Sequence, residues 1–334
     1  MREETTILYL VVPCYNEEEV LWKTSEVLKE KICRLMEKGS ISAKSKILFV
    51  NDGSKDKTWE IIYKLTQTDR IYAGLSFSRN FGHQSAILAG MMAARSHADA
   101  VVTIDADLQQ DIEALDEFLE RYEGGCDIVY GVRNDRNTDG FLKKSTAGIF
   151  YKLMHLLGCR TITNHADYRL MSKKALDALA EFHETNLFLR GLIPTMGFQS
   201  DIVYFDVKER EAGQSKYTFK KMLTLAMDGI TSMSTRPLEL IVVLGFITFL
   251  FSIGLFISCI VDWAQGEVVA GWTTTVASTC LIGGMTLLSQ GIIGEYIGKI
   301  YLESKGRPRY IVDKMVLRED DNEEDIDGSG KGNK

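Results

Sequence analysis

The sequence predicts an α/β fold, with a mostly parallel sheet covered by helices on both faces and a two-helix transmembrane hairpin near the C-terminus. Three observations predict it. Short runs rich in β-branched residues alternate with helical stretches from residue 6 to residue 133. Polar residues follow directly after four of these runs. Two long apolar segments then occur late in the chain, at 238–261 and 272–293.

Buried parallel strands are expected where the apolar runs are almost continuous, because such runs fit strands that are covered on both faces. These runs lie at 6–13, 46–52, 73–79, 100–105 and 126–133. Helices are expected between them, at 17–37, 56–65 and 84–96. The first helix is predicted to have Asn16 as its N-cap and Glu17 near its positive end.

The chain from 141 to 225 is less regular. Its pattern predicts helices near 143–157 and 173–183, a loop at 161–170 and a strand near 198–206. No internal repeat or Pro-rich linker divides this region from the first part of the chain, and the whole chain has only 4 prolines.

The two apolar segments predict membrane spans. The segment 238–261 is long enough to cross the ~30 Å hydrocarbon core. The segment 272–293 is more polar, and small residues such as Gly283 and Gly284 suit close helix packing, in a hairpin or against another copy. The connection 262–271 contains two acids and no Lys or Arg, whereas the outer flanks are basic, so both termini are predicted to be cytoplasmic. The basic residues on these flanks are Lys220, Lys221, Arg236, Lys299, Lys305, Arg307 and Arg309.

Composition excludes several classes of protein. The 6 cysteines form no C-x-x-C pair, which favours reduced thiols over a disulfide framework. The net charge is -7, and much of it comes from an acidic, Gly-rich tail after residue 318 that is expected to be disordered. No nucleic-acid partner is expected. No G-x-G-x-x-G and no G-x-x-x-x-G-K-[ST] motif is present, which argues against a dinucleotide dehydrogenase and a P-loop NTPase.

The fourth strand ends in "DADLQQD", which places Asp105 and Asp107 two residues apart just after a buried strand. Two carboxylates at this spacing can reach one divalent cation when the backbone turns between them, and Gln109 could add a neutral oxygen. Oxygen ligands suit Mg²⁺ or Mn²⁺, which commonly bind substrate phosphates as well. The alternative is a solvated acidic loop.

Polar residues also follow the first three strands, at the edge where parallel sheets bind ligands. Asp52 could accept hydrogen bonds from a base or a ribose, although "NDGS" is also strong turn chemistry. The other strand-end residues are Tyr15, Asn16 and Glu17 after the first strand, and Arg79 and Asn80 after the third. Together they indicate one nucleotide-binding crevice. "PCYNE" has a plain alternative as a helix cap.

These motifs, taken in order, resemble those of family 2 glycosyltransferases with the Rossmann-like GT-A fold. The segments that carry the resemblance are "VVPCYNEEE", "VNDGSKDKT", "SRNFGHQSAILAG", "DADLQQD", "ADYRLM" and "REAGQSKY". The two spans and "GIIGEYIGKIYLESKGRPRYIV" narrow the resemblance to bacterial polyisoprenyl-phosphate glycosyltransferases, such as the bactoprenol glucosyltransferases. Dolichyl-phosphate mannose synthase is a more distant relative. The resemblance runs from about residue 5 to 315.

The resemblance implies a role for each matching residue. Asp167 matches the position of the catalytic base, and Asp105, Asp107 and Gln109 would manage the metal and the diphosphate. The nucleotide sugar would be held by Pro13, Tyr15, Asn16, Glu17, Asp52, Arg79, Asn80, Asp105, Asp107 and Arg210. A phosphate-facing loop matches Arg210, Ser215, Lys216 and Tyr217. Val207 departs from the family, in which many members carry Arg, and leaves this loop one cation fewer.

Charge predicts which other residues meet the acceptor. A lipid monophosphate is anionic, so basic residues such as Arg133, Lys143, Lys144 and Arg210 could hold it, together with Ser215, Lys216 and Tyr217. Lys143 and Lys144 could equally belong to an ordinary surface. Because an ionised phosphate needs little activation, Asp167 could orient the acceptor or take a residual proton instead of acting as a strong base. The plain alternative for Asp167 is an ion pair with Arg169.

The sequence therefore predicts a membrane-anchored inverting glycosyltransferase. It would move one sugar, with glucose on UDP favoured, to undecaprenyl or another polyisoprenyl phosphate at the cytoplasmic face, with Mg²⁺ or Mn²⁺, for cell-envelope glycan modification. Its predicted parts are a cytoplasmic GT-A catalytic domain, a juxtamembrane segment, the hairpin, a juxtamembrane helix with a basic segment, and the tail, at 1–225, 226–237, 238–293, 294–317 and 318–334.

Other functions remain open at this point. The sugar could be N-acetylglucosamine, galactose or mannose. A processive polysaccharide synthase would need more spans and a Q-x-x-R-W element, and the sequence has neither. A non-enzymatic membrane adaptor would leave the strand-end acids without a purpose, and a nucleotide hydrolase would not need the hairpin. A homo-oligomer is a further possibility, through 283–284 and 294–303.

Overall fold

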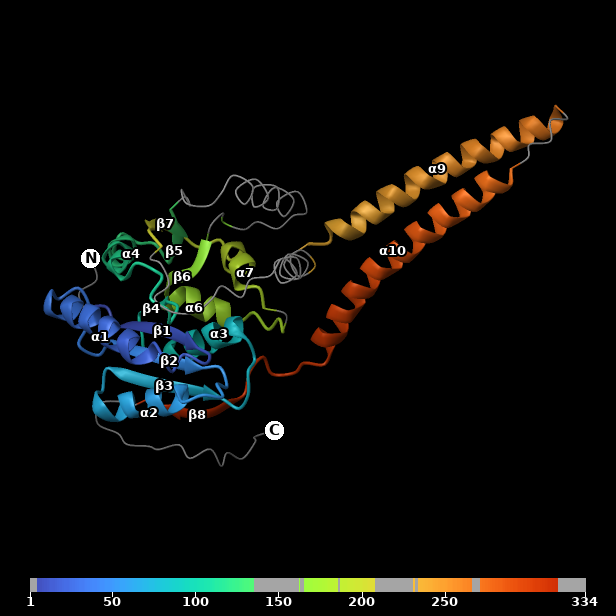
Figure 1. The fold of residues 1–334 in the computed structure, drawn as a ribbon. Helices are drawn as coiled ribbons and strands as arrows, with labels where there is room; N and C mark the ends of the chain where they lie inside the picture. The colour runs from blue at the N-terminus through green and yellow to red at the C-terminus, as the bar shows by residue number, and fades with distance from the viewer. Residues whose placement is uncertain are drawn as a thin grey trace. The chain divides into compact units, whose positions relative to one another are not determined.

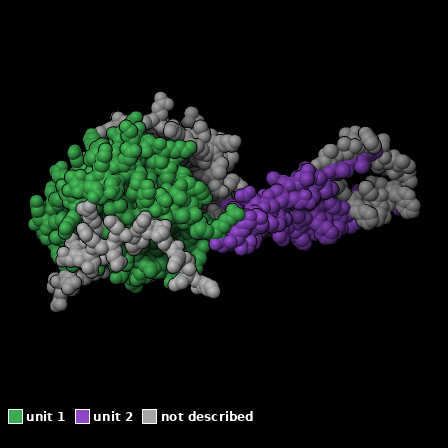
Figure 2. All heavy atoms as spheres, turned by 90° about the horizontal axis from the view of Figure 1, so that it is seen from below, with its two compact units in different colours: residues 1–145, 161–216, 307–334 green, residues 146–160, 217–306 purple. Residues whose placement is uncertain are grey.

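The computed structural model describes residues 5–134, 162, 165–185, 187–207, 231, 234–265 and 271–317. The chain divides into two compact units, coloured separately in Figure 2. The first contains residues 1–145, 161–216 and 307–334, and the second contains residues 146–160 and 217–306. The predicted helix near 143–157 and the acidic tail lie outside the described residues.

The first unit is built on one eight-stranded sheet with the order β7-β5-β6-β4-β1-β2-β3-β8 (Figure 1). The strands are β1 (Leu8–Cys14), β2 (Lys46–Asn51), β3 (Tyr72–Phe77), β4 (Ala100–Thr103), β5 (Ile128–Arg133), β6 (His165–Ser172), β7 (Ser200–Phe205) and β8 (Val312–Val316). All neighbouring pairs are parallel except those of β6 with β4 and β5, and of β8 with β3. The predicted mostly parallel α/β class is confirmed.

Helices cover both faces of this sheet. They are α1 (Leu21–Glu37), α2 (Thr58–Thr68), α3 (His83–Ala94), α4 (Leu115–Glu123), α6 (Lys173–Ala180) and α7 (Leu189–Thr195), with a short 3₁₀ helix at Ile112–Ala114 before α4. Successive side chains of β1 point to opposite faces of the sheet and enter two separate hydrophobic cores. Leu8, Leu10 and Val12 pack with α1 on one face, whereas Tyr9 and Val11 pack with α3 on the other.

The first helix begins later than expected, and the predicted N-cap at Asn16 is wrong. Asn16 has φ 55, a left-handed conformation that starts a turn instead of a helix. This turn is fastened to the loop after β2. The Asn16 N–H donates to Ser54 Oγ at 3.0 Å, and the Glu17 N–H donates to Thr58 Oγ1 at 2.9 Å. The helix therefore starts only at Leu21.

Two strands occupy segments where none was predicted. The expected loop at 161–170 overlaps β6, whose alternation was hidden because one of its buried faces carries His165, Asp167 and Arg169. The segment expected to be juxtamembrane contains β8, which pairs antiparallel with β3 at the edge of the sheet. Tyr310 stacks on Phe77 just before this strand, with 5.3 Å between the ring centroids.

The second unit contains the long helices α9 (Arg236–Ala264) and α10 (Trp272–Ser304). They contact each other, with Thr248 Oγ1 4.0 Å from Met285 Sδ. The expected second span and juxtamembrane helix form one continuous helix, α10. By length and composition, one stretch of the described helices is apolar enough to cross a membrane, Arg236–Gly254, with a mean hydropathy of 2.1. The second span at 272–293 stays a prediction.

Candidate active site

The strand order brings the predicted site residues to one edge of the sheet. Strands β4, β1, β2 and β3 are neighbours and run in the same direction. The residues that follow their carboxyl ends therefore gather at a single edge, which is where open α/β sheets bind their ligands. Pro13 lies inside β1, paired with Val50, and Tyr15 directly after β1 is 42% exposed.

Asp52 is buried after β2, and its carboxylate holds the loop between β3 and α3. Its Oδ1 accepts the Phe81 N–H at 2.7 Å, and its Oδ2 accepts the Gly82 N–H at 3.0 Å. Gly82 precedes α3 without a side-chain cap, so Asp52 satisfies donors at the helix start. Burial raises the pKa of Asp52, against the effect of these two hydrogen bonds. Its contact with a base or ribose stays a prediction.

Gly53 brings the same loop close to β2. It has φ 62, and a Cβ atom there would lie 2.2 Å from the carbonyl carbon of Arg79. Only glycine allows this approach. The guanidinium of Arg79 lies over the Phe81 ring at 3.9 Å from its centroid and donates to the Asn80 carbonyl at 3.0 Å. The predicted strand-end residues of β2 and β3 are thus held side by side.

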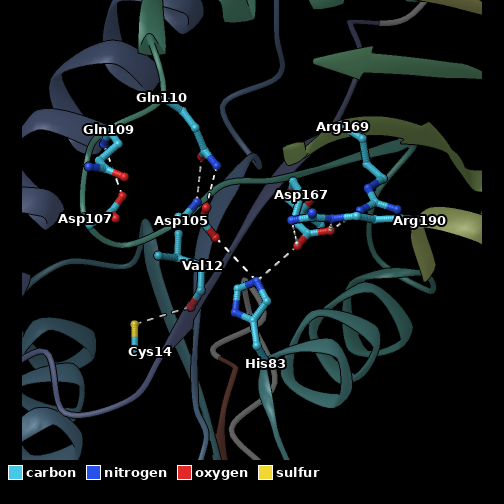
Figure 3. A network of polar contacts seen from close by, with 11 residues as sticks. Val12, Cys14, His83, Asp105, Asp107, Gln109, Gln110, Asp167, Arg169 and Arg190 are labelled. Carbon is cyan, nitrogen blue, oxygen red and sulfur yellow. Dashed lines mark hydrogen bonds and ion pairs between the residues drawn. The ribbon is translucent and has the colours of Figure 1, made fainter. Parts of the chain in front are cut away.

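The acidic turn after β4 is organised by two glutamines (Figure 3). Gln110 is buried and forms two hydrogen bonds with Asp105. Its Nε2 donates to Asp105 Oδ2 at 2.6 Å, and its Oε1 accepts the Asp105 N–H at 2.8 Å. Asp107 Oδ1 accepts the Gln109 N–H at 3.1 Å. Leu108 between them has φ 54, so the backbone of this turn holds a conformation that non-glycine residues rarely adopt.

The donor set of this turn fits a divalent cation in part. Asp107 and Gln109 lie together on one side of the turn and offer oxygen ligands of the kind that Mg²⁺ and Mn²⁺ prefer (Figure 3). The Asp105 carboxylate is directed toward His83 instead. Among the described residues, no group of three or more His, Cys, Asp or Glu side chains forms a metal cluster. The metal role of Asp105, Asp107 and Gln109 stays a prediction.

Asp167 lies on β6 inside a cluster of cations (Figure 3). The buried Arg169 donates to its Oδ1 at 2.5 Å, and Arg190 from α7 donates to both oxygens, at 3.1 Å from Nε and 2.7 Å from a terminal nitrogen. Burial acts to raise the pKa of Asp167, but Arg190, His83 and Arg169 outweigh it and hold that pKa well below its usual range.

This environment decides what Asp167 can do. A carboxylate whose pKa is depressed holds a negative charge firmly and accepts a proton poorly, so it is a weak general base. Two guanidinium groups fix its orientation instead. The ion pair with Arg169, which the sequence left open beside the catalytic role, is present. The geometry favours a carboxylate that orients other groups.

His83 joins the two acidic elements. It is the first residue of α3, and its Nε2 lies 3.5 Å from Asp105 Oδ1 and 3.5 Å from Asp167 Oδ2. Partial desolvation lowers the pKa of His83, whose side chain is 46% exposed, but the two carboxylates exceed that effect and raise the pKa above its ordinary value. Burial raises the pKa of Asp105, His83 opposes the rise, and Asp167 adds to it.

His165 is a buried polar group with an unusual environment. Its ring packs edge-on against Tyr130 at 5.0 Å between centroids, and within the described structure neither ring nitrogen has a hydrogen-bond partner. Burial, assisted by Arg169, lowers the pKa of His165 to about 2. The imidazole is therefore neutral in the folded protein.

We expect this histidine to make the fold sensitive to acid. An unfolded chain protonates His165 below its ordinary pKa of 6.5, whereas the folded chain does not until about pH 2, so the free energy of unfolding falls by up to ~1.4 kcal/mol per pH unit below 6.5. His165→Gln should remove this part of the slope, as measured by denaturant unfolding of the detergent-solubilised protein between about pH 7.5 and 5. His97→Gln is the matched control. Equal slopes in the wild type and His165→Gln would contradict this assignment.

Some predicted residues cannot be placed in this site. Arg133 ends β5 and is partly buried. The remaining predicted phosphate-binding residues lie outside the described residues; they are Lys143, Lys144, Arg210, Ser215, Lys216 and Tyr217. Their roles stay predictions.

The sequence missed three residues that organise the site, His83, Gln110 and Arg190. His83 belongs to "NFGHQ", a motif that carried the family resemblance, but histidines without zinc spacing gave no local signal. Gln110 was overshadowed by its neighbour Gln109. Arg190 lies on α7, a short helix that the sequence did not predict, and only the fold brings it to Asp167.

A parallel-rich α/β sheet with carboxylates after β2 and β4 at one edge has the architecture of α/β proteins that bind a ligand at the carboxyl ends of their strands. Residues 9–180 match the family described as glycosyl transferase family 2, which is about half of the chain. The chain belongs to this family and is a glycosyltransferase, as the resemblance implied.

Several relatives match almost the whole chain. An uncharacterized glycosyltransferase, YkoT, of Bacillus subtilis (strain 168) is 47% identical over 96% of this chain and 95% of its own. The bactoprenol glucosyl transferase of Shigella phage SfX is 40% identical over 91% of this chain and 97% of its own. A prophage bactoprenol glucosyl transferase homolog of Escherichia coli (strain K12) is 37% identical over 92% of this chain and 98% of its own.

Proposed function

We propose that this glycosyltransferase transfers one glucosyl residue from UDP-glucose to a polyprenyl phosphate, with undecaprenyl phosphate as the acceptor in the cell. The observation that carries the proposal is the 40% identity to the bactoprenol glucosyl transferase of phage SfX, which extends over 91% of this chain. A match over this share of the chain spans the acidic turn, β6 and both long helices.

The chemistry of the site supports a single displacement. An oxygen of the acceptor phosphate forms the new bond to the anomeric carbon of glucose, the bond from that carbon to the diphosphate breaks, and UDP leaves with the electron pair. Attack opposite the leaving group inverts the anomeric configuration. A phosphate monoester has a second pKa of ~6 and is mostly a dianion near neutral pH. The low pKa of Asp167 agrees with a reaction that needs no strong base.

Charge is the main obstacle, because the donor diphosphate and the acceptor phosphate are both anionic. Asp107 and Gln109 would hold Mg²⁺ or Mn²⁺, and the cation supplies positive charge that stabilises the UDP leaving group. Arg79 beside Asn80 is positioned near the β2 end, where it would meet a donor phosphate. Arg133, with Lys143, Lys144, Arg210, Ser215, Lys216 and Tyr217, would bind the acceptor phosphate, as the sequence predicts.

A panel of labelled donors tests this function. The full-length protein in detergent is given undecaprenyl phosphate and radiolabelled UDP-glucose, UDP-N-acetylglucosamine, UDP-galactose or GDP-mannose. Label is expected in the lipid phase with UDP-glucose. Label transferred only from another sugar would change the donor. Label in a long polymer would indicate a processive synthase, and release of free glucose without lipid label would indicate a hydrolase.

We also propose that α9 and α10 anchor the enzyme in the membrane as a hairpin, with both termini in the cytoplasm. The apolar stretch at Arg236–Gly254 and the acidic connection 262–271 support this topology. A cysteine introduced at Gly266, in a chain without its native cysteines, should react with a membrane-impermeant thiol reagent on intact cells. A cysteine at Ser329 should not. The opposite labelling pattern would rule out a cytoplasmic donor site.

A further inference from the structure

The start of α3 is held in place from two sides, which makes it a rigid platform. Asp52 accepts the N–H groups of Phe81 and Gly82 directly before the helix. Farther along the helix, a Cβ atom at Gly90 would lie 2.3 Å from Val11 Cγ1, so α3 lies tightly against β1. The first residues of α3 are therefore fixed relative to the sheet, unlike the residues of a free surface loop.

His83, the first residue of this platform, contacts carboxylates on two different strands. Its Nε2 is 3.5 Å from an oxygen of Asp105, which follows β4, and 3.5 Å from an oxygen of Asp167 on β6. A single N–H on Nε2 can be shared between these two acceptors. Because β4 and β6 are neighbouring strands, the imidazole separates two anions that would otherwise repel each other.

Gln84, the next residue, reaches Asp167 by a second route. Its Oε1 accepts the Leu189 N–H at 3.0 Å, at the first residue of α7. The following residue is Arg190, which binds both oxygens of Asp167. Gln84 thus fixes the helix that carries the main partner of Asp167. Two successive side chains of α3 act on the same carboxylate, one through a direct contact and one through α7.

We propose that His83 and Gln84 are positioning residues that hold Asp167 in register with the acidic turn at 105–109. They would connect the side of the site that binds the donor with the side that contains Asp167, without themselves contacting the substrate. The kinetic consequence rests on the proposed function, whereas the connection between the side chains does not. Loss of register is expected to slow the chemical step, because a displacement of about 1 Å in a reacting geometry can cost ~100-fold in rate.

The kinetic test uses the full-length protein with UDP-glucose and undecaprenyl phosphate. His83→Ala should lower kcat by roughly 30- to 100-fold and change the KM for UDP-glucose by less than about threefold. His83→Gln offers an N–H donor at a similar reach, and it should recover kcat to within about fivefold of the wild type. Gln84→Leu should lower kcat, and Gln84→Glu, which keeps an acceptor oxygen, should recover part of it. His97→Ala, three residues after the end of α3, should match the wild type.

Two kinetic results would overturn the proposal. One is a His83→Ala variant whose kcat stays within about threefold of the wild type. The other is a rise in the KM for UDP-glucose at unchanged kcat, which would make His83 a donor-binding residue. A His83→Gln variant as slow as His83→Ala would also contradict it, since the shared N–H would then not be what matters.

A second test does not depend on the acceptor or the sugar. Thermal unfolding is measured in two double-mutant cycles. One pairs His83→Ala with Asp167→Asn, and the other pairs His83→Ala with Asp105→Asn. Each cycle includes both single variants and the double variant. If the side chains interact as described, the changes in Tm of the single variants will not add up in the double variants. Additive changes in both cycles would overturn the proposal. If the wild type fails to glucosylate the lipid but the cycles are non-additive, the proposed function fails and the positioning role stands.

Discussion

Asp107→Ala is expected to lower kcat for glucosyl transfer by about 1,000-fold or more, equivalent to about 4 kcal/mol of transition-state stabilisation. The reason is charge. The carboxylate lies with Gln109 on the side of the acidic turn that faces away from His83 (Figure 3), where it would bind the cation that the departing diphosphate requires. The fold should persist, because Asp107 is not part of either buried core. The measurement is label transfer to undecaprenyl phosphate at saturating Mg²⁺ or Mn²⁺.

The control is another acid of the same segment. Asp111 accepts the Glu113 N–H at the start of the 3₁₀ helix, so Asp111→Ala should cost stability, about 0.5–2 kcal/mol, and leave transfer nearly unchanged. EDTA should stop the wild type, and added Mg²⁺ or Mn²⁺ should restore it. Activity of Asp107→Ala above about a tenth of the wild type would remove this residue from the metal site, because tenfold is only ~1.4 kcal/mol.

The second large effect is expected at Asp167. Asp167→Asn leaves the guanidinium of Arg169 fully buried without its anionic partner, and breaking a buried pair in this way typically costs ~3–5 kcal/mol of stability. Turnover should fall about 100-fold with it, because Arg190 and His83 lose the carboxylate that orients them. The KM for UDP-glucose should stay close to that of the wild type, since the predicted donor contacts among the described residues lie on or after β1 to β4 and not on β6.

Asp127→Asn is a matched control for this change. Asp127 is also a shielded carboxylate beside β6 and contacts Ser172 and Lys174, but it lies at the opposite end of that strand from His165. The Asp127→Asn variant should lose some stability and keep the turnover of the wild type. If Asp167→Asn raised the KM for UDP-glucose as much as it lowered kcat, the carboxylate would belong to the donor site. If the folded Asp167→Asn variant retained full turnover, the orienting role of Asp167 would be wrong.

The pH profile separates an orienting carboxylate from a general base. The pKa of Asp167 is held well below its usual range, so the carboxylate stays ionised throughout the pH range of the assay. It therefore contributes no fall in rate on the acid side near neutral pH. Any acid limb of the wild-type profile between about pH 5 and 7 should therefore come from other groups, such as the acceptor phosphate.

The sequence predicted the parallel centre of the sheet because β1 to β4 are continuous apolar runs, a pattern that leaves few alternatives. It did not predict β6, because His165, Asp167 and Arg169 interrupt one face with buried polar groups whose compensation depends on the fold. It did not predict β8 because a short, largely exposed edge strand has no periodic core face. Only the open edge of β3 selects that segment as a partner.

In the site, too, the sequence pattern predicts one part and only the fold determines the other. The strand-end rule brought Asp52, Asp105 and Asp107 to one edge correctly. Their individual roles depend on partners from distant segments. Asp52 binds backbone N–H groups thirty residues later in the sequence, and Asp167 is bound by Arg190 from a helix that was not predicted. Residue type and spacing show where carboxylates gather, whereas the hydrogen-bond donors that reach them are determined by tertiary structure.

The position of β8 has a consequence for how the protein is made. The chain leaves the first unit after residue 216 and returns to it at residue 307, so its sheet is finished by residues that are translated after both long helices. Until they emerge from the ribosome, β3 is an open edge that exposes backbone donors and acceptors to other nascent chains. Chains that terminate at 306 should therefore self-associate during synthesis, because both long helices are made before the strand that completes the sheet.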